Sequence, residues 1–297
     1  MKDTEYDTVR GRRYVPLIPY VNSLMQRGVA GWAILVGGTI VGAIALMTIF
    51  APWISPHDPT AISVGPLLSP PSSRFPLGTN HLGQDMLSRV YSGGALMSQV
   101  ALLSVIVCLL VGVPIGLFAS YAGGNTDKVT SLVMDSIYAF PGIVLAIAIA
   151  AMLGPGVINM SLSIAVVYVP SYFRIIRSEV LSIKELPYIE AAQMMGAKGR
   201  AILFRYILPN VVPSIVTIAT MNFADAILTA AGLTFVGLGL PVSTPDWGWD
   251  LTYGRKLLTS GTWWVITFPG LMIIFLALGF TLLGEGLSEL MNPRLQK

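Results

Sequence analysis

The 297-residue chain is 54% hydrophobic and only 11% charged, and its formal net charge is +3. Soluble globular proteins carry about 25% charged residues, so this composition excludes an ordinary soluble domain and indicates an integral membrane protein. The single cysteine, Cys108, excludes an internal disulfide. The sequence has no GxxxxGK[ST] motif, so any ATP that drives this protein must be bound by another chain.

Six segments of the chain are apolar enough to cross a bilayer. A membrane helix rises about 1.5 Å per residue and needs about 20 mainly apolar residues. The segments that we predict to span are Gly31–Ile54, Ala95–Ala122, Val129–Leu153, Ile158–Phe173, Val211–Leu240 and Trp263–Leu287. The sequence therefore predicts an all-α integral membrane protein with six transmembrane helices, the first of which is retained rather than cleaved as a signal peptide.

The connections between these segments predict the orientation. Residues 1–29 form a tail, residues 30–94 hold the first span and a long loop, and residues 95–297 hold the rest. Twelve of the 18 Lys and Arg residues lie in the termini, the second-to-third connection and the central loop 184–210, and two more, Arg174 and Arg177, lie between the fourth predicted span and that loop. The remaining four are Arg74, Arg89, Arg255 and Lys256. The positive-inside rule then predicts a cell-membrane protein with both termini and the central loop in the cytoplasm.

Two loops are expected on the outer side. The first, residues 55–94, is rich in Pro, Ser and Gly up to Pro76 and becomes helix-like from about Gly83. The second, residues 241–262, is rich in aromatic residues and is followed by Trp263 and Trp264. Such aromatic residues most often mark a membrane interface, and contact with an external partner or substrate is the alternative.

The central loop, Lys184 to Asn210, is a polar stretch that interrupts an otherwise very apolar sequence. Pro187 can open a helix because its missing N–H falls among the unpaired donors of the first turn. Ile189, Ala192 and Met195 form an apolar stripe along that helix, and Gly196 can end it in a left-handed conformation. A second helix over residues 198–207 is expected to end at Pro209. The loop is either a docking elbow with small residues beside Glu190 or an amphipathic connector.

The same loop resembles the EAA loop of ABC importer permeases. The resemblance rests on Glu190-Ala191-Ala192, then Gly196, then Ile207-Leu208-Pro209, although Tyr206 stands where the general pattern has Ile. In that family the loop forms the coupling helix that docks in a cleft of the ATP-binding subunit. The resemblance thus implies that Glu190, Ala191, Ala192, Gly196, Leu208 and Pro209 belong to the docking loop. We expect Glu190 to make a polar contact, Gly196 to allow the turn, and Ala191 and Ala192 to pack against the partner.

Two further stretches resemble the dipeptide and oligopeptide branch of these permeases. Residues 76–89 are similar to that branch's external PLGTDxLGRDVLSR segment, but Asn80 and Gln84 each lose a charge. Residues 232–239, followed by 244–248, are similar to its LSFLGLG…TPxWG segment. Ala230 stands where relatives commonly have Glu, so a role for that carboxylate is in doubt. The resemblance runs from about Ala30 to Arg294.

Two carboxylates fall inside predicted spans, Asp135 in the third and Asp225 in the fifth. A charge at the bilayer centre costs at least about 2.5 kcal/mol, so such residues normally face a bundle interior or a cavity. Asn222 lies one turn before Asp225 on the same helix face. The pair either lines a translocation path or makes a polar contact between helices. Asp135 is expected nearer the cytoplasmic end, with Lys128 as its candidate partner.

The resemblance implies a type I ABC importer permease fold in a transmembrane subunit without catalytic residues. It would form the path for di- or oligopeptides delivered by an external substrate-binding protein. Its partners would be a second homologous permease, membrane lipid and two ATP-binding subunits holding ATP and Mg²⁺, with no nucleic acid and no cofactor or metal of its own. Oligosaccharide, nickel and glutathione are alternative substrates in this family. A self-contained secondary transporter or channel using Asp135 or Asp225 is a second alternative, but it leaves the central loop without a role.

Overall fold

The computed structural model describes residues 28–239 and 244–291, and the described chain is helical, as the sequence predicts. The α-helices are α2 (Val29–Ile54), α3 (Met86–Ala122), α4 (Gly124–Tyr138), α5 (Gly142–Leu153), α6 (Val157–Lys184), α7 (Pro187–Met194), α8 (Gly199–Ala201), α9 (Leu208–Phe235), α10 (Trp247–Leu257) and α11 (Trp264–Met291). A π-helical segment, Ile202–Ile207, joins α8 to α9, and a 3₁₀ turn, Leu258–Ser260, follows α10. The predicted basic residues of both termini lie outside the described ranges.

Within residues 28–239 and 244–291, five helices are long and apolar enough to cross a membrane: α2, α3, α6, α9 with the segment before it, and α11. The third predicted span, Val129–Leu153, is wrong as a continuous helix. It divides into α4 and α5, which meet at an angle of 87°. Pro141, immediately before α5, lacks the N–H that a continuing helix would need. Six spans are obtained only if this bent pair is counted as one crossing.

Two spans begin or end far from their predicted limits. α3 begins at Met86 rather than Ala95, because the carboxylate of Asp85 caps it by accepting hydrogen bonds from the backbone N–H groups of Leu87 and Ser88. α6 continues past Phe173 to Lys184. Both helices therefore project beyond their apolar segments and connect the membrane part to its two polar ends.

The fifth span also differs from prediction. Pro209 does not end the second helix of the central loop, since residues 199–235 run as one continuous helix. The chain accommodates Pro209 by widening the preceding turn, where the N–H of Leu208 bonds to the carbonyl of Leu203, five residues back. A widened turn relieves the clash of the proline ring with the previous turn. The span ends at Phe235 rather than Leu240.

The core of the bundle is the close packing of α3 against α6. A Cβ atom added at Gly112 would lie 2.7 Å from the Cβ of Tyr172, and one added at Gly116 would lie 2.9 Å from the Cβ of Ile176. Small residues that allow such an approach are typical of packing between membrane helices. α3 and α6 therefore form a tightly packed pair against which α4, α5 and α9 are placed.

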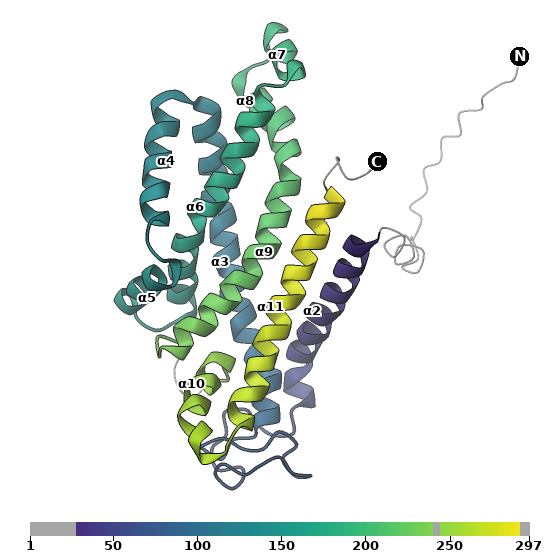
Figure 1. The fold of residues 1–297 in the computed structure, drawn as a ribbon, viewed down its shortest axis with the longest axis vertical. Helices are drawn as coiled ribbons and strands as arrows, with labels where there is room; N and C mark the ends of the chain where they lie inside the picture. The colour runs from purple at the N-terminus through teal and green to yellow at the C-terminus, as the bar shows by residue number, and fades with distance from the viewer. Residues whose placement is uncertain (1–27, 240–243, 292–297) are drawn as a thin grey trace, which may run out of the picture.

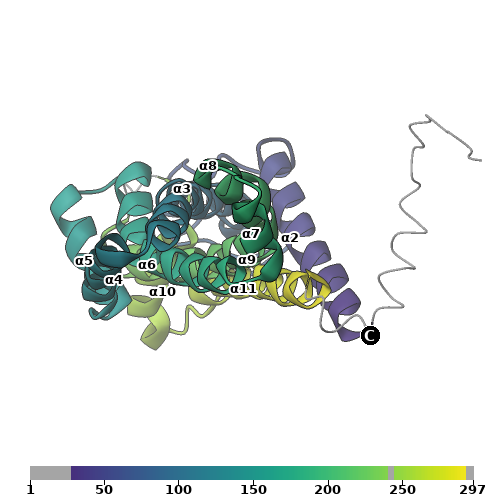
Figure 2. The same cartoon turned by 90° about the horizontal axis from the view of Figure 1, so that it is seen from above.

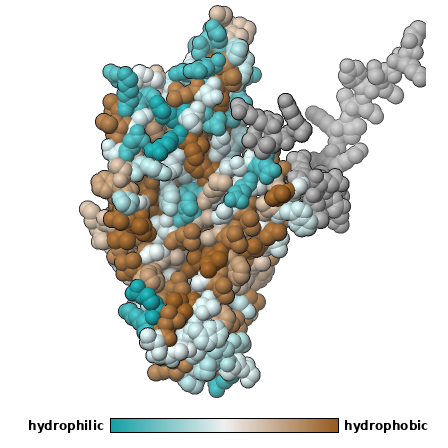
Figure 3. Space-filling model, in the orientation of Figure 1, coloured by the Kyte–Doolittle hydropathy of each residue, from teal (hydrophilic) through white to brown (hydrophobic). Residues whose placement is uncertain are grey.

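The molecule is elongated, with different polar structures at its two ends (Figure 1). α7 and α8 project at one end, and α10 lies with residues 55–85 at the other. Seen from above, α4 and α5 lie on the side of the bundle opposite α2 and α11 (Figure 2). Apolar residues cover the middle of the surface in Figure 3, whereas hydrophilic residues gather towards both ends. This distribution fits a chain whose middle is surrounded by lipid.

Candidate functional site

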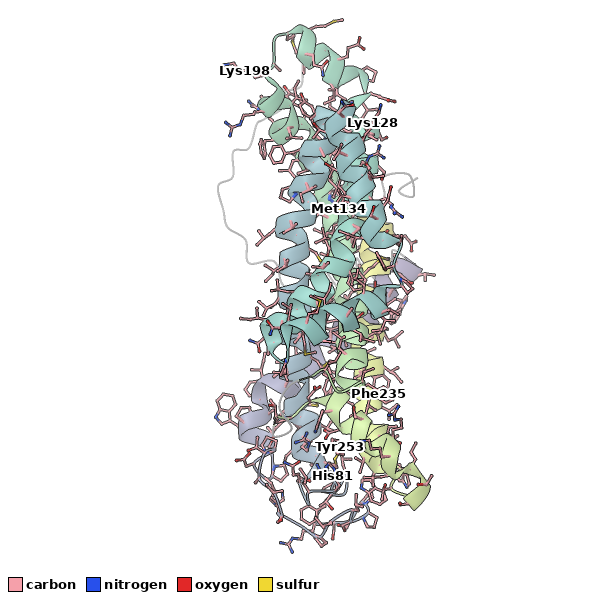
Figure 4. The ribbon with its side chains drawn as sticks, turned by 90° about the vertical axis from the view of Figure 1, so that its left-hand side faces the viewer. His81, Lys128, Met134, Lys198, Phe235 and Tyr253 are labelled. Atoms are coloured by element: carbon pink, nitrogen blue, oxygen red, sulfur yellow. The ribbon has the colours of Figure 1, made fainter. Side chains whose placement is uncertain are left out.

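The central loop folds into the elbow predicted from the sequence. α7 begins at Pro187 and ends at Met194. Gly196 then adopts a φ of +83°, the left-handed region that favours glycine. The N–H of Ala197 bonds to the carbonyl of Ala192 at 3.0 Å and closes the turn. In Figure 4, Lys198 marks this elbow at the end of the molecule opposite His81.

The faces of the elbow differ from prediction in two residues. Ile189 and Ala192 are buried, with exposed fractions of 0% and 1%. Ala192 therefore packs against its own chain and is not on the surface where we expected it to contact a partner. Met195 is 80% exposed because α7 ends one residue earlier and takes it out of the apolar stripe. Glu190 and Ala191 are exposed as expected. Met194, which is 81% exposed, joins them on the outer surface of the elbow.

Leu208 and Pro209 lie at the base of the elbow rather than at its tip. Leu208 packs against the core cluster that also contains Ile189, Leu203 and Ile207. Pro209 is exposed and occupies the first turn of α9. These two residues therefore connect the elbow to α9, and the exposed surface available for docking comes from α7 and the turn after it.

A cavity of about 420 Å³ opens between α6, α9 and the bent pair α4–α5. Asn222 and Asp225 both line it, so the structure brings these two predicted residues together. Two tyrosines of α6 line it as well: the hydroxyl of Tyr172 donates to Asn222 Oδ1 at 3.3 Å, and that of Tyr168 lies 2.9 Å from the hydroxyl of Thr229. The cavity is a polar recess in the apolar middle of the molecule.

The tyrosine pair was not found by the sequence analysis. Tyr168 and Tyr172 are four residues apart in an apolar helix, and that spacing places both on one helix face. The spacing was the available signal. Their phenol groups give the cavity hydrogen-bonding wall residues without adding a charge, which suits a path for polar solutes through an apolar layer.

Asp135 is not among the residues that line the cavity. It is 64% exposed and forms an ion pair at 3.0 Å with Arg174, so the expectation of Lys128 as its partner is wrong. Arg174 also lies over the ring of Tyr138, at 4.2 Å from the ring centroid. Lys128 is nearer to Asp135 in the sequence, but Arg174 is the residue that pairs with it, because the long helix α6 brings Arg174 alongside α4.

A second ion pair fixes α4 against α6. Arg177 donates two hydrogen bonds of 2.7 Å to the two carboxylate oxygens of Asp127. This bidentate geometry is the strong form of the arginine–carboxylate interaction. The two pairs hold the wall that α4 contributes beside the cavity, and the one-turn spacing of Arg174 and Arg177 was the sequence signal for them.

The opposite end of the molecule is a buried polar network centred on Arg89. Its guanidinium donates to Asp250 on α10 at 2.9 and 3.1 Å and to the side chain of Gln84 at 3.1 Å. The exposed fractions of the Arg89 and Asp250 side chains are 1% and 3%. The indole N–H of Trp247 adds a bond of 2.9 Å to the carbonyl of Val90. These contacts join the beginning of α3 to α10 across 161 positions of sequence.

The two departures from the external motif contact each other. The amide of Asn80 donates to the side-chain oxygen of Gln84 at 2.8 Å, and both residues are buried. A neutral amide pair therefore stands where the resembling segment has two opposite charges, so the two changes compensate. Ala230 is fully buried in the apolar core, and the chain offers no open place there for the carboxylate that relatives commonly carry.

Two acidic residues of this end are buried with raised pKa values. Burial raises the pKa of Asp246 to about 7, although its backbone bond from Gly248 acts in the opposite direction. Burial also raises the pKa of Asp250, against the charge of Arg89. Asp246 caps the N-terminus of α10. A carboxylate kept in so apolar a place indicates a rigid, water-excluding structure.

The sequence is similar to known proteins over most of its length. Residues 112–297 match the family model for the binding-protein-dependent transport system inner membrane component. Residues 32–71 match the N-terminal transmembrane domain of oligopeptide transport permease C.

Curated relatives and a solved structure agree with these family matches. The di/tripeptide transport system permease protein DppC of Pseudomonas aeruginosa is 38% identical, covering 85% of each chain. The glutathione transport system permease protein GsiD of Pectobacterium atrosepticum is 36% identical, covering 87% of this chain and 86% of that protein. The fold is similar, with a TM-score of 0.56 and 18% identity, to a chain of the methionine ABC transporter MetNI in an inward-facing conformation, covering 70% of this chain and 98% of that one. The chain therefore belongs to the family of binding-protein-dependent transport system inner membrane components, in the branch of the dipeptide and oligopeptide permeases.

Proposed function

We propose that this chain is the transmembrane subunit of an ATP-driven importer and forms half of a path for di- or oligopeptides. The observation that carries the proposal is the cavity lined by Asn222, Asp225, Tyr168 and Tyr172 in the middle of a membrane permease. Peptides present an amino group, a carboxylate and amide bonds. A carboxylate, an amide and two phenols can bind such groups, and the apolar remainder of the wall accepts varied side chains.

The importer needs other subunits, because this chain has no GxxxxGK[ST] motif for binding ATP and forms only half of the path. The second half of the path is supplied by a homologous permease beside α4, α5 and α9. Two ATP-binding subunits hold ATP and Mg²⁺ and contact the elbow in the cytoplasm, where both termini also lie. A substrate-binding protein delivers the peptide to the end formed by α10 and residues 55–85. Basic residues support this orientation, since Lys198 and Lys128 lie at the elbow end in Figure 4.

The elbow transmits motion because its inner face is part of the bundle core. Ile189 is fully buried in one apolar cluster with Ile176 of α6 and Ile207 before α9. A displacement of α7 by the ATP-binding subunits therefore moves α6 and α9, the two helices that carry the polar residues of the cavity. Rigid-body movement of these helices would open the cavity alternately to the two sides.

Peptide uptake by the complete complex in proteoliposomes tests this function. ATP inside the vesicles with the ligand-loaded binding protein outside should drive accumulation of a labelled dipeptide, and a non-hydrolysable ATP analogue should not. Uptake that proceeds without the ATP-binding subunits would refute the importer role and favour a secondary transporter or channel.

Glutathione is the alternative substrate with a specific observation in its favour, since one relative is a glutathione permease at 36% identity. The same vesicles, tested with glutathione, nickel and an oligosaccharide in place of the dipeptide, decide between the substrate classes. Accumulation of one of these instead of the dipeptide would keep the importer role and replace the peptide.

A further inference from the structure

A second pocket, of about 350 Å³, lies at the outer end of the molecule between the last residues of α9 and the helix α10. Its wall is aromatic on one side, with Phe235, Trp249 and Tyr253, and carries two cations, Arg255 and Lys256. Figure 4 shows Phe235, Tyr253 and His81 together at this end, far from the elbow. Neither the family resemblance nor the proposed cavity assigns a role to this pocket.

Three nitrogen-bearing side chains of the pocket, Trp249, Arg255 and Lys256, have no hydrogen-bond partner among the described residues, and all three are donors. The indole N–H of Trp249 is shielded from solvent and has no partner among the residues described, and an indole can only donate. Neither Arg255 nor Lys256 forms an ion pair with another residue of the described ranges. The Thr252 hydroxyl is already bonded to the carbonyls of Thr234 and Gly248. The missing group is therefore an acceptor, and the two cations favour one with negative charge.

Aromatic rings contact the Arg255 and Lys256 cations without accepting conventional hydrogen bonds from their N–H groups. The guanidinium of Arg255 lies 4.5 Å from the ring centroid of Phe235, and the ammonium of Lys256 lies 5.2 Å from that of Tyr253. Cation–π contacts leave N–H groups free for a ligand. The nearby acid Asp250 cannot neutralise them, because its carboxylate is bound to Arg89. His81, stacked on Tyr253, has its pKa lowered by burial and by the charges of Arg89 and Lys256, which indicates a positive environment.

The pocket is aligned with the central cavity. Asp225, Gly232 and Val236 follow the spacing of one face of α9, with Asp225 in the cavity and Val236 in the pocket. Gly232, between them, faces Ile143 of α5. The eleven-position separation of Asp225 and Val236 corresponds to about 16 Å along a helix. α10 and α5 also lie on the same side of the bundle in both Figure 1 and Figure 2.

We infer that this outer pocket binds the terminal carboxylate of a peptide before it enters the central cavity. Arg255 and Lys256 provide the charge, Trp249 donates a hydrogen bond, and the rings of Phe235 and Tyr253 contact the adjacent apolar part of the peptide. The inference rests on the proposed function and adds a carboxylate-selecting site to the permease itself.

Fluorine NMR of the complete transporter in nanodiscs, labelled with 5-fluorotryptophan, tests the inference directly. The Trp249 resonance is identified by its loss in Trp249→Phe. Titration with the dipeptide Ala-Ala should shift this resonance, and Ala-Ala amide, which lacks the carboxylate, should bind at least tenfold more weakly. The double change Arg255→Gln with Lys256→Gln should abolish the shift. Arg74→Gln should keep it, because Arg74 is an exposed cation of the same end that lies over Phe75 and outside the pocket.

Three results would overturn the inference: no shift with either peptide, equal shifts with both, or a shift that follows the phosphatidylglycerol content of the disc instead of the peptide. The last result would assign the pocket to a lipid phosphate. ATP-driven peptide uptake by a complex whose Trp249 resonance ignores Ala-Ala would refute the site and keep the proposed function. A carboxylate-dependent shift without any peptide uptake would keep the site and refute the function.

Discussion

The two polar ends of the molecule are built in opposite ways. At the end formed by α10 and residues 55–85, which we propose faces outward and call the outer end, Arg89, Asp250 and Trp247 are buried and bonded to one another or to the backbone across long sequence distances. At the elbow end, Glu190 on α7 and Met195 immediately after that helix are exposed, and within the described chain neither side chain makes a hydrogen bond or an ion pair. The inner face of α7 is anchored in the apolar core, and the exposed Tyr188 of this helix accepts one hydrogen bond of 3.4 Å from the side-chain amide of Asn210.

The difference suits the two ends to different roles, a fixed surface at one end and transmission of movement at the other. A buried polar network is rigid because a group that loses its partner there stays out of contact with water and without a hydrogen bond, which is costly. Such an end can present a fixed surface to a delivery protein. An exposed turn anchored by a few apolar residues can bind a moving partner and pass displacement into the helices below. The outer end should therefore respond to mutation through stability, and the elbow end through coupling.

The largest effect is expected from Arg89→Met, because it leaves Asp250 buried without its partner. Breaking a buried pair costs about 3–5 kcal/mol, so the variant should accumulate poorly in membranes and melt at a clearly lower temperature in detergent. Arg200→Met, which removes an exposed arginine of the elbow end, is the matched control and should melt as the parent does. Combining Arg89→Met with Asp250→Leu should recover part of the loss. Equal stability of Arg89→Met and Arg200→Met would remove the contrast between the ends.

Two glycines allow a matched test of coupling. Gly196 at the elbow and Gly261 at the outer end have φ values of +83° and +77°, and an added Cβ would meet nothing within 4 Å at either position. A side chain in this region costs about 1–3 kcal/mol in backbone strain at both. Gly196→Trp should insert normally but raise the ATP hydrolysed per peptide imported. Gly261→Trp should leave that ratio unchanged, and equal ratios in the two variants would make the elbow a mere connector.

Substitutions of two carboxylates distinguish residues that line the cavity from residues that only hold its wall in place. Asp225→Asn should lower peptide uptake about tenfold, the equivalent of about 1.4 kcal/mol in the barrier, because Asp225 lines the cavity. Asp135→Asn should stay within about twofold of the parent, since an exposed ion pair contributes about 0–1 kcal/mol. Initial uptake rates at saturating binding protein measure both. A larger loss in Asp135→Asn would place the path along α4 instead.

The smallest effect is a pH dependence of stability at the outer end. Burial raises the pKa of Asp246 from 3.8 to about 7, so between about pH 4 and pH 7 the folded chain binds more protons than the unfolded chain. Stability therefore decreases as pH rises through this range and is constant above it. Asp246→Asn keeps an oxygen for the cap on Gly248 and should reduce this decrease by a few degrees in Tm. Identical pH profiles for the variant and the parent would show that Asp246 is ionised in the fold.

Local signals in the sequence predicted much of this architecture. Runs of apolar residues placed the long helices, and Pro187 with Gly196 placed the elbow, since each depends only on neighbours along the chain. Asn222 and Asp225 were found together because one helical turn separates them. The sequence did not predict that Asn222 and Asp225 share a cavity with Tyr168 and Tyr172, because this proximity depends on how α6 packs against α9.

The features that were missed depend on tertiary structure. The 87° bend before α5 and the widened turn before Pro209 are two different responses to a proline, and the neighbouring helices decide between them. The bond between Arg89 and Asp250 crosses 161 positions. Ala192 was expected on the outside because small residues suit both a docking surface and a tight core, and the sequence does not separate these uses.

We propose the elbow, and no other part of this chain, as the contact with the ATP-binding subunits. Replacing Cys108 by Ala removes the single cysteine, after which Met195→Cys and Thr259→Cys place one exposed thiol at each end. With a short bifunctional cross-linker on the assembled complex, the cysteine at position 195 should join this chain to an ATP-binding subunit, with a yield that changes when ATP is added. The cysteine at position 259 should give no such product. A product at position 259, or none at position 195 in a complex that still transports, would contradict the account.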